Sequence, residues 1–134
     1  MNESETRAEL IDPKLRAAGW GIVEESKILR EHVITQGRVQ SGGRGKKEIA
    51  DYVLVYKGIK LAIVEAKGED VPVSEGVMQA KKYASKLKIE TTYSTNGKEI
   101  YYINMSTGEE NLVASFLSPQ QLWEMTFPQT EKVN

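Results

Sequence analysis

Residues 49–67 read IADYVLVYKGIKLAIVEAK, two apolar segments on either side of Lys57-Gly58. Both segments are rich in Val, Leu, Ile and Tyr, which is typical of β-strands, and we predict that they form a β-hairpin. The exceptions are Asp51 in the first segment and Glu65 and Lys67 at the end of the second. Side chains two residues apart lie on the same face of a strand, so Glu65 and Lys67 point the same way. Charged side chains are costly to bury without a partner, which makes this hairpin the first candidate for a functional site.

The register of the hairpin decides whether Asp51 and Glu65 lie on the same face of the sheet. A two-residue turn at Lys57-Gly58 would place Asp51 opposite Val64, and Glu65 would then point to the other face. We therefore predict either a three-residue loop, Lys57 to Ile59, or a β-bulge near Asp51. Each of these would bring the two carboxylates together.

A divalent metal ion that bridges Asp51 and Glu65 would be a suitable partner for the two carboxylates. The chain has no cysteine and one histidine, so oxygen ligands are expected, which favours Mg²⁺, Mn²⁺ or Ca²⁺. Such an ion polarises a phosphate and lowers the pKa of a bound water, and Lys67 would position that water. The three residues therefore indicate a metal-dependent phosphodiesterase. The alternative is a surface hairpin whose charges are solvated or paired in ordinary salt bridges.

Helices and a second hairpin are predicted around this segment. Pro13 is expected to kink or restart the first helix with Asp12 as its cap, and Asn96-Gly97 is a strong turn signal. The expected helices cover residues 4–18, 74–87 and 118 onward, and the second hairpin covers residues 91–105. This order indicates an α/β fold with a mixed central β-sheet flanked by helices. The 134 residues suffice for one domain, which we place at residues 1–127, with residues 128–134 expected to begin a linker.

The charge of the chain bears on its partners. The formal net charge is −1, whereas a free-standing DNA-binding domain usually has a basic excess that neutralises phosphates. Either the chain binds no nucleic acid, or another component delivers the nucleic acid to it. The candidate DNA contacts lie in the glycine-rich segment 37–47 and on the second helix, and they are Arg38, Arg44, Lys46, Lys47, Lys81 and Lys82. No apolar run approaches the roughly 20 residues of a membrane span, so no membrane partner is expected.

Two motifs in the chain resemble those of known nucleases. Asp51 with Glu65-Ala66-Lys67 resembles the D…ExK signature of the PD-(D/E)xK nuclease superfamily, although Ala50 stands where the superfamily's name has a proline. Gln79 and Tyr83, four residues apart and so on one face of the second helix, resemble the QxxxY motif of nucleases of the RecB and type I restriction type. The resemblance implies that both residues approach the active site or the DNA backbone.

The first helix adds a third resemblance. The stretch from Glu5 to Asp12 looks like the opening helix of the type I restriction endonuclease motor subunit. In related nucleases an acid on this helix reaches the metal site, which leaves Glu5 and Glu9 as candidates here. We favour Glu9, because its neighbour Leu10 indicates a position nearer the buried side of the helix.

Taken together, these motifs resemble the N-terminal nuclease domain of a type I restriction enzyme R (motor) subunit. The resemblance implies a Mg²⁺-dependent endonuclease module that hydrolyses double-stranded DNA without its own sequence specificity. An ATP-dependent translocase outside this chain would deliver the DNA, in a complex with methylation and specificity subunits in the bacterial or archaeal cytoplasm, and the isolated domain is expected to be monomeric. The implied catalytic residues are Asp51, Glu65, Lys67, Gln79, Tyr83 and Glu9. The implied metal ligands are Asp51, Glu65 and the backbone carbonyl of Ala66.

Two alternative functions remain open from the sequence. The first is a stand-alone repair or resolvase-type nuclease of the same fold, for which a basic dimer face would be expected. The second is a non-catalytic DNA-binding scaffold domain that keeps the fold without the chemistry. The intact set of Asp51, Glu65 and Lys67 argues against the second, because a degenerate member would be expected to have lost one of them.

Overall fold

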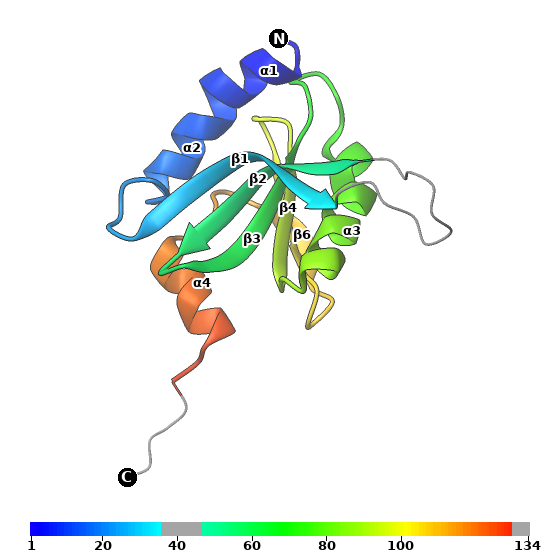
Figure 1. The fold of residues 1–134 in the computed structure, drawn as a ribbon. Helices are drawn as coiled ribbons and strands as arrows, with labels where there is room; N and C mark the ends of the chain where they lie inside the picture. The colour runs from blue at the N-terminus through cyan, green and yellow to red at the C-terminus, as the bar shows by residue number, and fades with distance from the viewer. Residues whose placement is uncertain (36–46, 130–134) are drawn as a thin grey trace.

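The computed structural model of this protein describes residues 1–35 and 47–129 (Figure 1). In those residues six strands form one sheet in the order of the sequence, and neighbouring strands are antiparallel except for β3 and β4. The strands are β1 (Ser26–Thr35), β2 (Glu48–Tyr56), β3 (Ile59–Ala66), β4 (Thr91–Thr95), β5 (Ile100–Asn104) and β6 (Glu110–Val113). The predicted α/β fold with a mixed central sheet is therefore confirmed.

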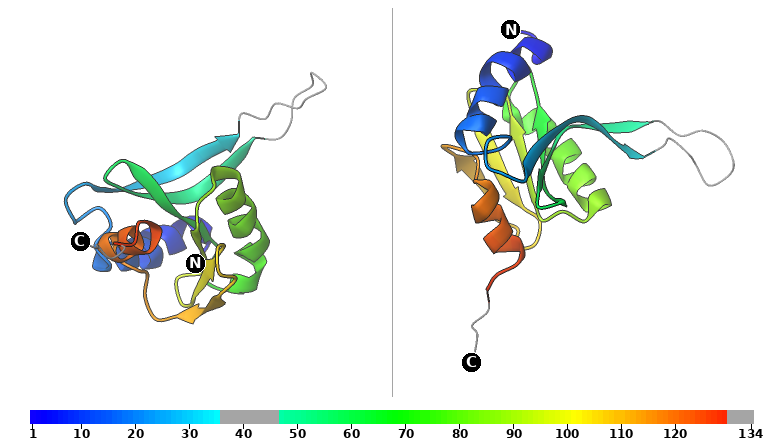
Figure 2. Two further views of the ribbon diagram at one scale, coloured as in Figure 1. Left: turned by 90° about the horizontal axis from the view of Figure 1, so that it is seen from below. Right: turned by 60° about the vertical axis from the view of Figure 1, so that its left-hand side comes forward.

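Helical segments cover both faces of this sheet (Figures 1 and 2). One face carries α1 (Glu3–Thr6), the π-helical turn η1 (Arg7–Ile11), α2 (Asp12–Ala17) and α4 (Pro119–Thr126). The other face carries the 3₁₀ turn η2 (Val73–Gly76) and α3 (Val77–Leu87). The sheet is thus buried from both sides, which explains why β2 and β3 are almost continuously apolar.

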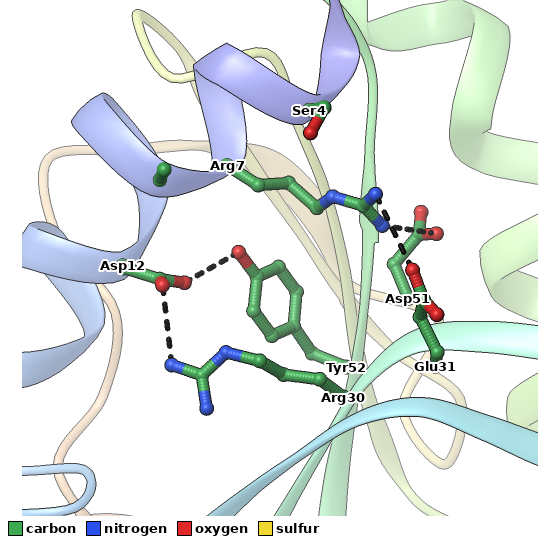
Figure 3. Close-up of a pocket in the computed structure, with 8 residues that line it drawn as sticks. Ser4, Arg7, Asp12, Arg30, Glu31, Asp51 and Tyr52 are labelled. Atoms are coloured by element: carbon green, nitrogen blue, oxygen red, sulfur yellow. Dashed lines mark hydrogen bonds and ion pairs between the residues drawn. The ribbon is translucent and has the colours of Figure 1, made fainter.

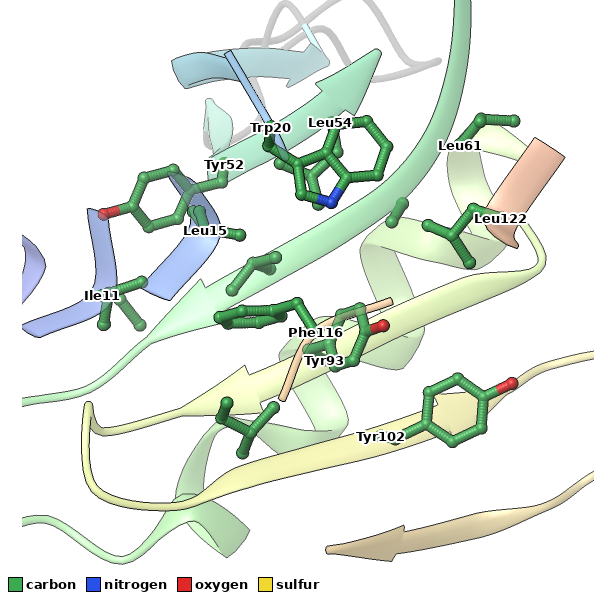
Figure 4. Close-up of a cluster of buried hydrophobic side chains, with 14 of the residues drawn as sticks. Ile11, Leu15, Trp20, Tyr52, Leu54, Leu61, Tyr93, Tyr102, Phe116 and Leu122 are labelled. Atoms are coloured by element: carbon green, nitrogen blue, oxygen red, sulfur yellow. The ribbon is translucent and has the colours of Figure 1, made fainter. Parts of the chain in front are cut away.

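The larger hydrophobic core lies between the sheet and the first set of helices (Figure 4). Its largest fully buried side chains are Trp20, Tyr52, Tyr93, Ile11 and Leu15. The indole N–H of Trp20 donates to the Leu117 carbonyl at 2.8 Å, which satisfies the one polar group of this large buried side chain. A smaller core under α3 contains Val53, Ile63 and Tyr83.

Pro13 is accommodated by a π-helical turn in an otherwise continuous N-terminal helical segment. The backbone N–H of Asp12 donates to the carbonyl of Arg7, five residues earlier. Proline has no N–H and its ring collides with the carbonyl four residues before it, so a wider turn ahead of Pro13 relieves the collision. The prediction that Asp12 caps the restarted helix is wrong, because α2 begins without a side-chain cap. The Asp12 carboxylate instead accepts a hydrogen bond from the Tyr52 hydroxyl at 2.6 Å.

The β2–β3 hairpin has a two-residue turn, so the predicted three-residue loop from Lys57 to Ile59 is wrong. Tyr56 pairs directly with Ile59. Lys57 and Gly58 both have positive φ angles, 52° and 80°, which is the conformation of a type I′ turn. The twist of this turn matches that of the two strands it joins.

A β-bulge at Leu61 corrects the register that this turn would otherwise impose. The pairing of β2 with β3 shifts by one residue there, so that Leu61 is an extra residue on β3. The predicted bulge therefore exists, but it lies close to the turn rather than near Asp51. Beyond the bulge Tyr52 pairs with Val64, which places Asp51 opposite Glu65. This is the arrangement that the candidate site requires.

The parallel strands β3 and β4 are connected through η2 and α3. The predicted helix over residues 74–87 is confirmed from Val77 onward, and its first turn is 3₁₀-helical. No side-chain cap is formed at the start of either segment. The crossover brings Gly76 against the side chain of Lys67, where a Cβ atom on Gly76 would lie 3.4 Å from Lys67 Cε. The start of α3 therefore lies over the end of β3.

The remaining elements follow local signals in the sequence. Ser118 and Gln121 form a reciprocal capping box at the start of α4, as expected for a helix beginning at Ser118-Pro119. The Asn96-Gly97 turn joins β4 to β5. No helix in the described part of the chain is long and apolar enough to cross a membrane. Residues 130–134 of the expected linker lie outside the described residues.

Candidate functional site

Two acidic side chains, Asp51 on β2 and Glu65 on β3, lie side by side at the centre of the candidate site. The backbone N–H of Asp51 donates to Glu65 Oε2 at 3.2 Å, and the backbone N–H of Ala66 donates to Asp51 Oδ2 at 2.7 Å. Each carboxylate is therefore held by a main-chain amide of the opposite strand. Glu65 is only 5% exposed. Its burial, and then the neighbouring charge of Asp51, raise the pKa of the Glu65 carboxyl to about 8.

This pair fits the oxygen donor set of a divalent cation. Two adjacent carboxyl groups repel when both are ionised, and the charge of Asp51 adds to the effect of burial in raising the pKa of Glu65. A bound Mg²⁺ or Mn²⁺ would supply a counter-charge and displace the proton. In the described part of the chain no three Asp, Glu, His or Cys side chains converge as a metal site. A further ligand would then have to be a backbone oxygen, as predicted for the Ala66 carbonyl, or water.

Lys67 lies next to this pair, at the point where β3 ends. Its backbone N–H donates to the Thr95 carbonyl at 2.8 Å, which fixes the chain to β4. Its positive charge partly opposes the rise in the pKa of both Glu65 and Glu3. The close approach of Gly76 confines its side chain from the α3 side. The structure thus brings Asp51, Glu65 and Lys67 together.

Gln79 and Tyr83 come to the same region from α3. The side-chain amide of Gln79 donates to the Tyr83 hydroxyl at 2.8 Å, across one helical turn. Tyr83 is buried, and its pKa is raised first by burial and next by the negative charge of Glu65. The hydroxyl therefore remains protonated at neutral pH. Because it already accepts from Gln79, its own hydrogen is left to donate.

The acid that the N-terminal helix contributes is Glu3, and neither Glu5 nor Glu9 is placed there. Glu9 is exposed, so the reason for favouring it, a position nearer the buried side, is wrong. Glu5 instead completes a capping box by accepting from the Asn2 N–H at 3.0 Å. The Arg7 guanidinium contacts the carboxylates of both Glu3, at 4.0 Å, and Asp51, at 3.2 Å, and the pKa of Glu3 is raised by burial and next by the charge of Asp51. The predicted helix began at residue 4 and so left Glu3 out.

Arg7 is a further residue of the site whose partners the sequence did not reveal. It follows Glu3 by one helical turn, and its guanidinium reaches Asp51 Oδ1 at 3.2 Å (Figure 3). Arg7 lines a pocket of about 170 Å³ beside Asp51, together with Arg30, Glu31 and Tyr52 among others. Only the pairing of β1 with β2 brings Arg30 and Glu31 to this place, and a single sequence carries no direct signal of that pairing.

The candidate DNA-binding residues are distributed over two regions. Arg38, Arg44 and Lys46 lie outside the described residues, and Lys47 is exposed just before β2. On α3 the two predicted lysines extend toward different strands of the sheet. Lys82 pairs with Glu48 on β2 at 2.6 Å, whereas Lys81 pairs with Glu110 on β6. These two lysines do not form a single basic stripe, and their contact with DNA stays a prediction.

Comparisons with known proteins agree with one another. The family model described as type I restriction enzyme R protein N terminus matches residues 30–111. The type I restriction enzyme EcoAI endonuclease subunit of Escherichia coli is 29% identical over 135 residues, a match that covers 92% of this chain and 16% of that subunit. A solved fragment of an HsdR subunit assigned to a type I restriction enzyme of Vibrio vulnificus is similar with a TM-score of 0.86 and 40% identity, covering 94% of this chain and 25% of that chain. The chain therefore spans a small part of the length of either relative.

Proposed function

The chain belongs to the family of type I restriction enzyme R protein N termini, and on that premise we propose that it is the Mg²⁺-dependent DNA endonuclease module of such an enzyme. One observation carries the proposal. Asp51 and Glu65 are held side by side by main-chain amides in a largely buried site, with Lys67 adjacent. Together with Gln79 and Tyr83, this set resembles the motif residues of PD-(D/E)xK nucleases, which supports the proposal.

The chemistry follows from these side chains. Mg²⁺ held by Asp51, Glu65 and the Ala66 carbonyl would polarise the scissile phosphodiester and lower the pKa of a bound water. Lys67 orients the attacking water through its N–H donors and stabilises negative charge on the phosphate. Tyr83, fixed by Gln79, donates its hydroxyl hydrogen toward the DNA backbone.

The partners are proposed from the charge distribution and the short span of the chain. The net charge is −1, and Lys81 and Lys82 are paired with glutamates of the same chain. We therefore propose that double-stranded DNA is held mainly by other parts of the enzyme, namely an ATP-driven translocase, a specificity subunit and a methylation subunit. This module would then cut without sequence specificity of its own, in the cytoplasm of a bacterial or archaeal cell. Because Lys81 and Lys82 each pair with a glutamate of the same chain, they are less available to DNA phosphates. This disfavours a stand-alone nuclease that binds DNA through these lysines.

The first test is calorimetric titration of the 134-residue chain with Mn²⁺ and Mg²⁺. Asp51→Asn and Glu65→Gln keep the shape of each side chain and are expected to abolish binding while unfolding remains cooperative. Glu48→Gln is the matched control, because Glu48 lies on β2 and pairs with Lys82 and Lys86. Binding that persists unchanged in both site variants would remove the metal from the mechanism and favour the scaffold domain instead.

A second test addresses the chemistry in the complete restriction enzyme. Lys67→Met is expected to reduce DNA cleavage by at least roughly 100-fold, the scale of a lost general acid–base or water-positioning group. ATP hydrolysis by the translocase should be unaffected, and Mn²⁺ affinity of the isolated chain should change little. Full cleavage by this variant would exclude Lys67 from the reaction.

A further inference from the structure

Arg7 lies beside Asp51, one of the two carboxylates at the centre of the candidate site (Figure 3). Its guanidinium donates to Asp51 Oδ1 at 3.2 Å and also contacts the carboxylates of Glu31 at 3.6 Å and Glu3 at 4.0 Å. The side chain is 23% exposed, so these contacts are shielded in part from water. The guanidinium of Arg7 therefore contacts three acidic side chains, which come from three different elements.

Glu31 combines this contact with an unusual backbone conformation in β1. Arg30 pairs with Tyr52 and His32 pairs with Ala50, so Glu31 lies opposite Asp51 across β1 and β2. Its φ angle is 51°, a left-handed conformation that is uncommon for a residue other than glycine. Two acids thus face each other across the strands, and Arg7 lies against both.

Both oxygen atoms of Asp51 are already engaged. Oδ2 accepts the Ala66 N–H at 2.7 Å, and Oδ1 accepts from the Arg7 guanidinium. The Ala66 amide belongs to β3 and cannot withdraw without breaking the sheet. The guanidinium stands at the end of a long side chain that faces a pocket of about 170 Å³. Each carboxylate oxygen has two lone pairs, so a cation that binds Oδ1 beside Arg7 would lie directly against the guanidinium charge, and the repulsion between the two cations favours the withdrawal of Arg7.

We propose that Arg7 is the resident counter-ion of Asp51, which a divalent metal ion must displace in order to bind. The proposal rests on the metal-dependent function proposed above and adds a positioning residue to it. In the metal-free protein Arg7 neutralises Asp51 and holds its carboxylate in place. It competes with the metal ion both for Oδ1 and through the repulsion of two cations at short distance.

The direction in which the Mn²⁺ affinity changes when Arg7 is replaced distinguishes a displaceable counter-ion from a residue that only supports the fold. If Arg7 competes with the ion, Arg7→Gln binds Mn²⁺ more tightly than the wild type, by roughly tenfold, the scale of one charge-assisted hydrogen bond. If Arg7 only supported the fold, its removal would loosen Asp51 and weaken binding. Arg7→Lys keeps the charge and should stay close to the wild type. Arg30→Gln is the matched control, because Arg30 lines the same pocket but pairs with Asp12 at 3.2 Å.

The experiment is calorimetric titration of the wild type, Arg7→Gln, Arg7→Lys and Arg30→Gln with Mn²⁺. Thermal denaturation with and without the ion accompanies it. Without metal, Arg7→Gln is expected to unfold at a lower temperature than the wild type. When the ion is added, the melting temperature of Arg7→Gln is expected to rise more than that of the wild type. Unchanged or weaker Mn²⁺ binding by Arg7→Gln would overturn the proposal, while leaving the metal site intact if Asp51→Asn still abolishes binding. Absence of Mn²⁺ binding by the wild type would overturn the proposed function, and this inference with it.

A second measurement uses the wild-type chain and does not depend on the folding of any variant. The guanidinium nitrogen resonances of Arg7 are followed by NMR during titration with Mg²⁺. Without the ion, we expect the rotation of the Arg7 guanidinium to be slow. At saturation with Mg²⁺ we expect the guanidinium to be released from Asp51 and to rotate faster, while the Arg30 signals stay unchanged. Arg7 signals that keep their metal-free state at saturating Mg²⁺ would refute displacement.

Discussion

Replacing Glu65 by glutamine is expected to stabilise the metal-free protein at neutral and alkaline pH. Glu65 is 5% exposed, and its Oε2 accepts the Asp51 N–H at 3.2 Å. Glutamine has the same shape and retains an acceptor oxygen for this hydrogen bond, but it carries no charge beside Asp51. The substitution therefore removes the cost of ionising a buried carboxyl group and leaves the packing nearly unchanged.

The size of this stabilisation follows from the difference between the pKa of Glu65 in the folded chain and its pKa in the unfolded chain. Burial and the charge of Asp51 raise the pKa of Glu65 from 4.5 to about 8 in the folded chain. Between these values the folded state holds a proton that the unfolded state has released, so the free energy of unfolding falls as the pH rises through this window. One pKa unit corresponds to about 1.4 kcal/mol, so the loss by the top of the window is on the order of 4 kcal/mol. Glu65→Gln lacks this loss, and titrating groups that do not interact with Glu65 cancel in the difference.

The assay is urea denaturation in the presence of EDTA from pH 5 to pH 9, followed by the fluorescence of Trp20 and Trp123. The advantage of Glu65→Gln should be near zero at pH 5 and should grow toward pH 8. Glu48→Gln is a control of opposite sign. Hydrogen bonds from Lys82 and Lys86 lower the pKa of Glu48, so its removal should destabilise the chain above the ordinary glutamate pKa. A variant Glu65→Gln that is less stable than the wild type at pH 8, or a pH-independent difference, would refute the reasoning.

Three further substitutions test the packing that positions the site, and urea denaturation measures the stability of each variant. Gly76→Ala is expected to lower the free energy of unfolding by about 1–3 kcal/mol, because the added methyl group overlaps the buried Ser94 hydroxyl, and an unchanged stability would contradict the close approach of α3 to β4. Gly97→Ala is expected to be more damaging than Gly58→Ala, since both glycines have positive φ angles (87° and 80°) but only the methyl group at Gly97 would meet a neighbour, Leu10 Cβ at 2.7 Å. Equal losses in these two variants would mean that backbone strain alone decides the cost.

Elements with a complete local signal were predictable from the sequence. Ser118-Pro119 followed by Gln121 contains all the atoms of the capping box that starts α4, so no distant contact is needed to place that helix. Asn96 likewise turns the β4–β5 hairpin through its own side chain, which accepts from the Lys98 and Glu99 amides at 3.0 Å and 2.9 Å. The strand β6 was not predicted, because it has little buried apolar surface and is defined mainly by its pairing with β5.

The composition of the site was predicted in part, and the errors have a geometrical cause. The N-terminal helix turns Glu3 and Arg7 toward Asp51, since residues four apart share a helix face. Glu5 lies about 200° around the helix from Glu3 and faces another direction. The choice of Glu9 relied on its neighbour Leu10, but consecutive residues lie about 100° apart around a helix, and the π-helical turn at residues 7–11 widens the helix there. Nothing near Glu9 in the sequence other than Pro13 indicates the wider turn.

Both the fold and the candidate site depend on the bulge at Leu61. Leu61 and Ala62 are consecutive, yet both belong to the core on the α2 and α4 side, which requires an extra residue in the strand. The sequence hides this bulge because residues 61–64 are all apolar and suit either face of a sheet buried from both sides. With the two-residue turn and no bulge, Glu65 would project into the larger core, and Val64 would lie beside Asp51. The same local irregularity thus keeps a carboxylate out of the main core and creates the acidic pair, which ties the proposed metal site to the register of a single hairpin.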